Sequence, residues 1–208
     1  HTRLQGDWSS DVCSSDLREL GYAVLSTLEA MEPPGQALVL EGIVESGAPL
    51  ATWKRVPVSA SPVLRSVCRR VEMPLKNWPS AAQLQQQYQQ CTDRALAERL
   101  RRKLLIRQAL GDGATYGMEL YGWRVGDAVV LGTLGESYSW LQQHLRAQLP
   151  GTAVIWMNLI NGSLGYLPPA SLYDTNVYQA WQTPLERGCL ELLESAAAAL
   201  ARELLASP

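Results

Sequence analysis

The sequence predicts an α/β fold in which helices flank a mixed sheet that contains a parallel βαβ unit. Two nearly continuous apolar runs, 128–134 and 152–160, indicate strands buried on both faces. Residues 136–149 between them place apolar side chains at helical spacing, and Pro150-Gly151 ends that pattern. A strand, a helix and a strand of these lengths form a βαβ unit, so we expect the two strands to be parallel.

Residues 1–17 are expected to lie outside this fold as a non-native, disordered leader. They repeat Ser-Ser-Asp, show no apolar periodicity, and lack the cationic start and apolar core of a secretory signal. The string resembles translated sequencing-adapter sequence, so His1, Trp8 and Cys13 are not candidates for a site; a genuine disordered Ser-rich leader is the alternative. Residues 18–208 then form one domain, because domains commonly span roughly 100 to 200 residues.

The segments that follow differ in how clearly they predict an element. Apolar residues at helical spacing predict an amphipathic helix over 18–31, which the Pro-Pro-Gly at 33–35 ends. Residues 36–62 contain a short apolar run followed by Gly and Pro, and we expect irregular, insert-like structure there. Alternation over 66–75 predicts a half-buried strand, and Pro74 indicates a sheet edge or a strand end.

The remaining elements have clear boundaries in the sequence. One long helix or two short ones are expected over 80–110, with Ser80 as N-cap and Gly111 as the stop. Alternation over 116–125 predicts a strand that a tight turn at Gly126-Asp127 joins to the first buried strand. A final helix is predicted over 185–205. Its expected core face consists of Leu185, Cys189, Leu192, Ala196, Leu200 and Leu204.

Charge and hydropathy argue against several kinds of partner. The formal net charge is −2 without an acidic or basic tail, so we expect no nucleic acid or anionic membrane as a partner. The basic cluster at 99–103 is interpreted as a solvated helix face, because Asp93 and Glu98 dilute it and no aromatic residues interleave with it. No apolar run approaches the roughly 18 residues of a transmembrane helix, so we expect no transmembrane segment.

Cysteine and histidine usage argues against thiol chemistry. Outside the leader, Cys68, Cys91 and Cys189 are odd in number and widely spaced, which disfavours a disulfide framework or a cysteine-based zinc site. A catalytic thiol would need a histidine nearby, and only His144 remains. Because His144 belongs to the predicted crossover helix, we interpret it as a flanking helix residue rather than a metal ligand.

Polar residues follow both buried strands, at the sheet edge where parallel strands commonly place their ligand-binding groups. Gly135-Glu136 follows the first strand and the segment from Asn161 to Tyr166 follows the second. We therefore expect Glu136 and this turn to lie at the same edge. Tyr178 comes twelve residues after Tyr166, beyond a loop that contains two prolines.

These residues form a motif of three parts. It consists of Gly-Glu after one buried strand, Asn-x-x-x-x-Tyr after the next, and a second Tyr twelve residues later. It resembles the C-terminal half of the catalytic domain of the neutral/alkaline non-lysosomal ceramidases, which are zinc amidohydrolases that cleave the amide of N-acylsphingosines. The resemblance covers about residues 116–205. It implies that Glu136 and Tyr166 are zinc ligands, that Tyr178 holds the developing oxyanion, and that the substrate is an N-acyl amide lipid.

The resemblance also implies that residues 18–208 are the C-terminal part of a larger amidohydrolase domain. The family's two histidine zinc ligands and its serine nucleophile belong to the N-terminal half, so we expect this fragment alone to be inactive. Gln179 stands where the family usually has Glu after the second tyrosine, and the C-terminal β-sandwich of the larger members is missing. A carboxylate and a tyrosine therefore need nitrogen ligands from elsewhere to complete a zinc site.

Each site residue has an alternative interpretation. Glu136 could lie in the first turn of a helix, where the macrodipole favours an acidic residue by roughly 0.3 to 1 kcal/mol. Tyr166 and Tyr178 could be packing aromatics. For the whole protein, the alternatives are a non-catalytic lipid- or sugar-binding protein of the same fold, or another metal-dependent hydrolase on that fold.

Overall fold

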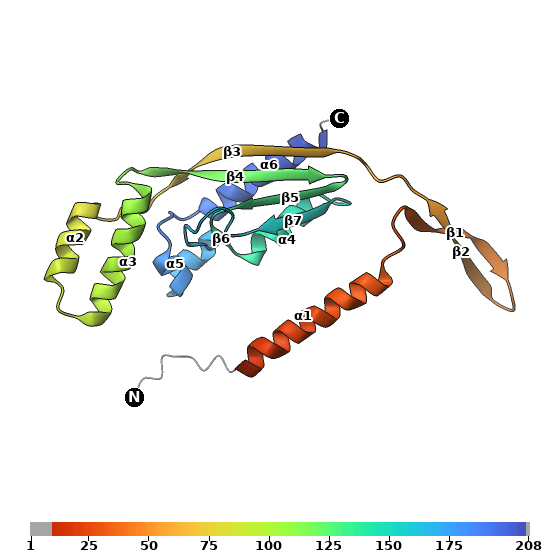
Figure 1. Ribbon diagram of the computed structural model, residues 1–208, viewed down its shortest axis with the longest axis horizontal. Helices are drawn as coiled ribbons and strands as arrows, with labels where there is room; N and C mark the ends of the chain where they lie inside the picture. Colours follow the sequence, from red (N-terminus) through yellow and green to blue (C-terminus); the bar gives the residue numbers. More distant parts are fainter. Residues whose placement is uncertain (1–9, 207–208) are drawn as a thin grey trace. The chain divides into compact units, whose positions relative to one another are not determined.

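The computed structural model describes residues 10–206, with side chains from Leu17 onwards, and the chain divides into two compact units. The first unit ends at Ala60 and the second begins at Ser61. The first unit consists of helix α1 (Ser10–Ala30) and an antiparallel hairpin of β1 (Gln36–Glu45) and β2 (Pro49–Pro57), all shown in Figure 1. Each unit therefore has its own secondary structure.

Helix α1 begins inside the segment for which we expected disorder. It runs without a break from Ser10 to Ala30, so the boundary expected after Leu17 is not a structural boundary. Residues 1–9 of the expected leader lie outside the described residues. From Leu17 to Ala30 every residue is exposed. The missing apolar periodicity in the leader thus does not prevent a helix, because the segment contains no proline.

The hairpin of β1 and β2 corrects the expectation of irregular structure over 36–62. Its prolines, Pro49 and Pro57, are the end residues of β2, where a strand tolerates a missing donor. Gly42 lies at a register shift between the strands, and Gly47 lies in the turn with a φ of 77°. The glycines and prolines therefore mark a bulge, a turn and two strand ends within regular structure.

The second unit is built on a four-stranded sheet with the strand order β3-β4-β5-β7. β3 (Leu64–Pro74), β4 (Thr115–Val125) and β5 (Ala128–Thr133) are antiparallel neighbours, and β3 is the edge strand that the sequence predicted. β7 (Ala153–Met157) pairs parallel with β5, and α4 (Ser139–Gln148) connects the two. The predicted α/β class, mixed sheet and parallel βαβ unit are confirmed.

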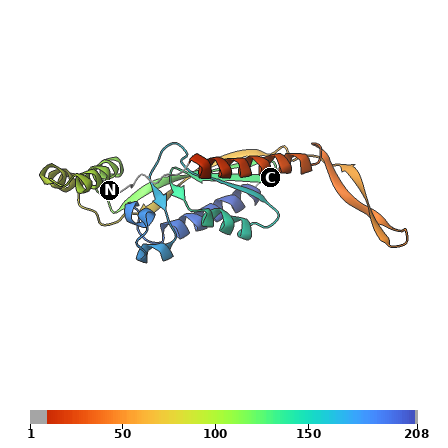
Figure 2. The same cartoon turned by 90° about the horizontal axis from the view of Figure 1, so that it is seen from below.

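Two helices, α4 and α6 (Cys189–Ala206), cover one face of this sheet (Figure 2). Alternate sheet residues form the core against them, and each fully buried large apolar side chain contributes roughly 1.5 to 3 kcal/mol. The fully buried sheet residues are Met73, Met118, Leu120, Val129 and Leu131. On the opposite face Val130 is half-buried and Ile155 is 48 % exposed. The apolar runs are therefore buried on one face, and the expectation of burial on both faces was wrong.

Two helices begin later than their apolar periodicity predicts. α4 starts at Ser139, because Glu136 and Ser137 form a short strand, β6, that pairs parallel with β8 (Tyr166–Leu167). α6 starts at Cys189, and Leu185 instead forms an isolated bridge with Leu75. The buried face of α6 also differs from the expected one, because Leu192 is 41 % exposed rather than in the core. Its place is taken by Leu190, Leu193, Ala197 and Ala201.

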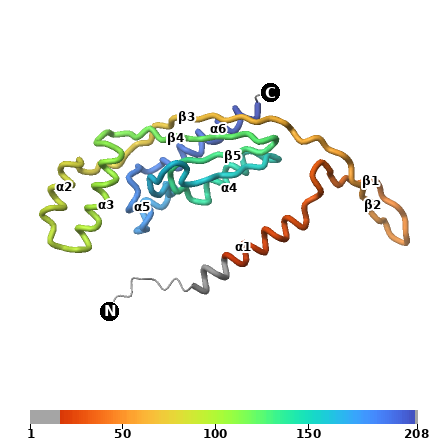
Figure 3. The backbone as a smooth tube through the Cα atoms, in the orientation of Figure 1, coloured from red at the N-terminus to blue at the C-terminus, as the bar shows by residue number. Residues whose placement is uncertain are grey.

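Beyond one end of the sheet, α2 (Ala81–Gln90) and α3 (Arg94–Leu110) form a helical hairpin (Figures 1 and 3). Ser80 caps α2 as predicted, and Gln83 completes a reciprocal capping box with it. Gly111 ends α3 with a φ of 79°, a conformation that favours glycine. Of the two arrangements that the sequence allowed, two short helices are present. No helix among residues 10–206 is long and apolar enough to cross a lipid bilayer.

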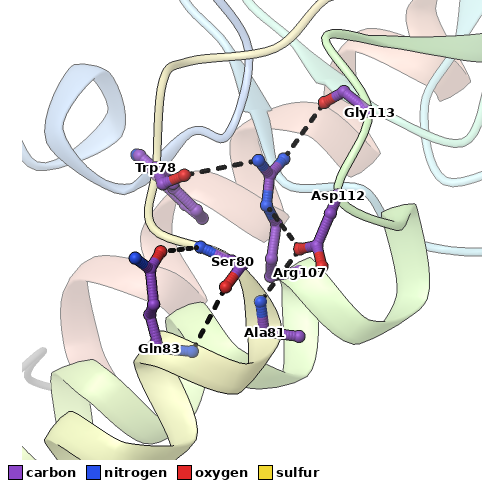
Figure 4. Close-up of polar contacts among 7 residues, drawn as sticks. All are labelled: Trp78, Ser80, Ala81, Gln83, Arg107, Asp112 and Gly113. Carbon is purple, nitrogen blue, oxygen red and sulfur yellow. Dashed lines mark hydrogen bonds and ion pairs between the residues drawn. The ribbon is translucent and has the colours of Figure 1, made fainter.

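The buried side chain of Arg107 ties the two ends of this helical hairpin together (Figure 4). Its guanidinium donates to the backbone carbonyls of Trp78 and Gly113, each at 3.3 Å. Its Nε lies 3.2 Å from the carboxylate of Asp112, which also accepts from the Ala81 amide at 2.9 Å. The segment that enters α2 is therefore fixed against the segment that leaves α3.

Candidate functional site

Glu136 and Tyr166 face each other directly in the short parallel strand pair just past the end of β5. They are partners in the register of β6 and β8. The Glu136 amide donates to the Gly165 carbonyl at 2.9 Å, and the Leu164 amide donates to the Leu134 carbonyl at 3.1 Å. Because residues paired across neighbouring strands project to the same face, the carboxylate of Glu136 and the phenol of Tyr166 project from the backbone side by side. Both residues lie at the sheet edge where we expected them.

Local chemistry explains why the two loops can approach so closely. A Cβ atom at Gly135 would overlap the end of the Leu167 side chain, so any larger residue there would have to displace this buried leucine. The Asn158 side chain accepts from the Ser137 amide and donates to the Ser137 carbonyl, both at 3.1 Å, and so takes the place of a neighbouring strand. Asn161 has a φ of 58°, in the left-handed region that asparagine tolerates better than most residues.

Tyr178 joins these two residues from a third segment of the chain. It is the first residue of α5 (Tyr178–Gln182), which follows a 3-10 helix at Ala170–Asp174 and contacts β8. The rings of Tyr178 and Tyr166 meet edge to face with centroids 6.0 Å apart, and the ring of Trp181 lies 6.3 Å from that of Tyr178. The structure thus brings together all three residues that the ceramidase resemblance singles out.

The surroundings of Tyr166 raise the pKa of its phenol. Burial is the largest cause, and the negative charge of Glu136 acts in the same direction. Tyr166 is therefore a neutral phenol at neutral pH. A cation bound beside both oxygens would reverse this preference, because it would stabilise the phenolate.

The donor set fits one side of a zinc coordination sphere. Glu136 and Tyr166 offer a carboxylate and a phenol oxygen from adjacent strand positions, and catalytic zinc commonly has three protein ligands and one open position. Among the side chains that the structure describes, no group of three His, Cys, Asp or Glu residues could hold a metal ion. The nitrogen ligands of such a site would therefore come from outside the described residues.

His144 does not approach this pair of oxygen donors. It lies on α4, where its ring stacks on Trp140 with centroids 3.7 Å apart. Its Nδ1 atom is 3.4 Å from the Glu194 carboxylate on α6. The interpretation of His144 as a flanking helix residue agrees with these contacts.

A cavity of about 220 Å³ lies against the same loops. The Tyr121 hydroxyl donates to the Glu119 carboxylate in its wall, and this hydrogen bond is the main reason why the pKa of Tyr121 is raised. The sequence offered no signal for this cavity, since its walls come from β4 and from the loops after β5 and β7. The lining residues are Tyr116, Gly117, Glu119, Tyr121, Leu134, Ile160 and Asn161.

The basic face of α3 is solvent-exposed at Arg99, Arg101 and Arg102, as interpreted from the sequence, and it also lies against aromatic side chains that the sequence did not indicate. The guanidinium of Arg99 is 5.2 Å from the ring centroid of Trp181. The Nζ atom of Lys103 is 5.8 Å from the same centroid and 5.0 Å from that of Trp78. These tryptophans come from the segment before α2 and from α5, so no spacing along α3 could reveal them.

The basic face also reaches the candidate site. Hydrogen bonding to Glu98 is the main cause that raises the pKa of Arg102. Arg101 shares the same Glu98 carboxylate at 2.8 Å. Trp181, which lies beside Arg99, has its ring 6.3 Å from that of Tyr178, the tyrosine that the resemblance assigns to the oxyanion.

Comparison with known proteins shows a partial structural similarity. No family model matches the chain, and no curated protein matches it at a significant level. A solved structure of a ceramidase complexed with C2 has 16 % sequence identity, with a TM-score of 0.36 over 42 % of this chain and 15 % of that one. The neutral ceramidase from Pseudomonas aeruginosa has 13 % identity, with a TM-score of 0.43 over 69 % of this chain and 29 % of that one.

Both of these proteins are ceramidases. The chain spans less than a third of the length of either. The assignment of the site residues rests on the local geometry and on the motif instead.

Proposed function

We propose that the intact protein is a zinc-dependent amidohydrolase that cleaves the N-acyl amide bond of ceramide-like lipids. The observation that carries this proposal is the direct pairing of Glu136 with Tyr166, with Tyr178 edge-on to the latter at 6.0 Å between ring centroids. The three residues come from three separate segments. Their meeting at one sheet edge therefore supports a shared role more strongly than their spacing in the sequence does.

In this proposal the three site residues have two different tasks. Glu136 and Tyr166 would hold the metal through their oxygen atoms, and zinc bound there would supply polarisation of the amide carbonyl and a lowered pKa of the attacking hydroxyl or water. Tyr178 donates its hydroxyl hydrogen to the carbonyl oxygen as negative charge develops there.

The test is a measurement of zinc content and N-acyl amide hydrolysis in the full-length protein and in Glu136→Ala. We expect zinc and activity to be lost together, because the metal loses its charged ligand. Glu45→Ala removes an exposed carboxylate at the end of β1 and is expected to keep both. Full zinc content in Glu136→Ala would overturn the assignment of the metal site to this sheet edge.

A further inference from the structure

We propose that the basic face of α3 and the aromatic side chains beside it form a docking surface for an anionic lipid bilayer. This docking surface consists of Arg99, Arg102, Lys103, Trp78 and Trp181. The inference rests on the proposed function, because an enzyme for N-acyl amide lipids has to take its substrate from a membrane. It reverses the expectation, drawn from the net charge, that an anionic membrane is not a partner.

Helix α3 carries a local excess of positive charge, although the net charge of the whole chain is negative. On its basic face Arg99, Arg101, Arg102 and Lys103 stand against Glu98, a formal charge of +3, whereas the whole chain carries −2. A charged surface responds to groups within about one Debye length, which is roughly 10 Å at 0.1 M salt. The relevant quantity is therefore the charge of this face.

Exposed aromatic side chains complete the docking surface. Trp181 is 42 % exposed, and the neighbouring Tyr178 is 49 % exposed. Trp and Tyr are enriched at the interfaces of membranes, where their rings lie at the level of the headgroups. Lys and Arg extend their apolar stems along such rings and keep their charges among the headgroups. Arg99 and Lys103 already lie over the ring of Trp181, so both kinds of group share one surface.

The docking surface is held in place before any lipid binds. Arg107 fixes the backbone of Trp78 against the end of α3 (Figure 4). Lys76 donates to the Ala180 carbonyl at 2.6 Å and so joins the segment before α2 to α5, which carries Trp181. A surface that is already ordered loses little conformational entropy on binding.

The position of the docking surface suits delivery of a lipid to the candidate site. The ring of Trp181 lies 6.3 Å from that of Tyr178, whose ring meets that of Tyr166. Headgroups bound at the docking surface would therefore lie beside the proposed oxyanion donor.

Co-sedimentation of the 208-residue chain with lipid vesicles tests this inference. We expect binding to vesicles of phosphatidylcholine with phosphatidylglycerol, little binding to phosphatidylcholine alone, and release at about 0.5 M NaCl because salt screens the attraction. Each Lys or Arg near an anionic bilayer contributes about fivefold to binding, so Arg99→Gln with Lys103→Gln should weaken it about 25-fold. The matched control is Arg146→Gln with Arg202→Gln, which removes two exposed cations from α4 and α6 and should bind like the unaltered chain.

Tryptophan fluorescence provides a second measurement. Lipids brominated on their acyl chains should quench the fluorescence of the unaltered chain, and Trp181→Phe should remove a large part of this quenching. Equal binding to neutral and anionic vesicles, or undiminished binding by a folded Arg99→Gln/Lys103→Gln protein, would overturn the inference. Vesicle binding needs neither zinc nor turnover, so it can fail while the amidase proposal holds, and the reverse.

Discussion

Tyr166 and Tyr178 have the same side chain but stand in different surroundings. Burial and Glu136 raise the pKa of Tyr166, whereas Tyr178 is 49 % exposed and lies beside Trp181. The first environment suits a metal ligand once a cation is present, because the cation stabilises the phenolate. The second suits a hydrogen-bond donor. The two tyrosines should therefore respond differently to removal of the hydroxyl.

In the full-length protein we expect Tyr178→Phe to keep its zinc but to lose about 100- to 1000-fold in turnover, with little change in KM, because its hydroxyl is used mainly in the transition state. Tyr166→Phe should weaken zinc binding, but less than Glu136→Ala does, since the carboxylate ligand remains. Metal analysis alongside steady-state kinetics separates these outcomes. If the Tyr178→Phe enzyme were as active as the unaltered one, the assignment of Tyr178 to the oxyanion would be wrong, and the residue would have only a packing role.

The sequence predicted the candidate site only through a motif. The spacing of Glu136, Tyr166 and Tyr178 resembles that of a known family, and the strand pattern placed the first two at one sheet edge. Nothing comparable connects Arg99 with Trp181, because these residues lie on separate helices. A contact between two distant segments does not change the spacing of apolar residues in either segment. Without a motif, the sequence therefore does not reveal it.

Among the elements, the sequence predicted well those strands and helices whose apolar residues follow a regular spacing. It did not predict short strands that pair over only two residues. β6 was assigned to the following helix, because the helical spacing of Leu141 and Leu145 extends backwards over Glu136. Its backbone is instead bound by Gly165 and by the Asn158 side chain. Such partners come from other loops, and only the folded chain reveals them.

Gly132, near the end of β5, tests how tightly β5 and β7 are packed. A Cβ atom there would lie 2.5 Å from the carbonyl oxygen of Met157, so Gly132→Ala has to push β7 away. We expect a loss of about 1 to 3 kcal/mol in the free energy of unfolding. Gly113→Ala is the matched control, because its nearest neighbour would be 3.5 Å away, an ordinary contact. Thermal denaturation followed by circular dichroism would contradict this expectation if both variants melted alike.

At the scale of the whole molecule, the unit that begins at Ser61 contains the complete hydrophobic core around the sheet. We expect deletion of residues 1–17 to leave the melting temperature of the chain unchanged, because the segment shows no apolar periodicity and its described side chain, Leu17, is exposed. Differential scanning calorimetry of the two forms is the measurement, and Gly132→Ala shows that it can detect a loss of stability. A drop of several degrees in the shortened chain would show that the leader belongs to the fold.

The partial metal shell leads to a second prediction for the molecule as a whole. Residues 18–208 contribute only Glu136 and Tyr166 to the proposed zinc site, so we expect neither tight zinc binding nor amidase activity from this chain alone. Isothermal titration with zinc is the measurement, and the full-length protein is the comparison. A stoichiometric site with submicromolar affinity in residues 18–208 would mean that the ligands lie within this chain after all.

The pairing of β6 with β8 opens a route for protein engineering. Positions 136 and 166 are held opposite each other by main-chain hydrogen bonds, including the one from the Glu136 amide to the Gly165 carbonyl. Their separation is therefore set by the backbone and does not depend on which side chains occupy them. Imidazole and carboxylate ligands favour different metals. Exchanging the residues at these two positions could therefore change which metal the site prefers, while the surrounding backbone stays the same.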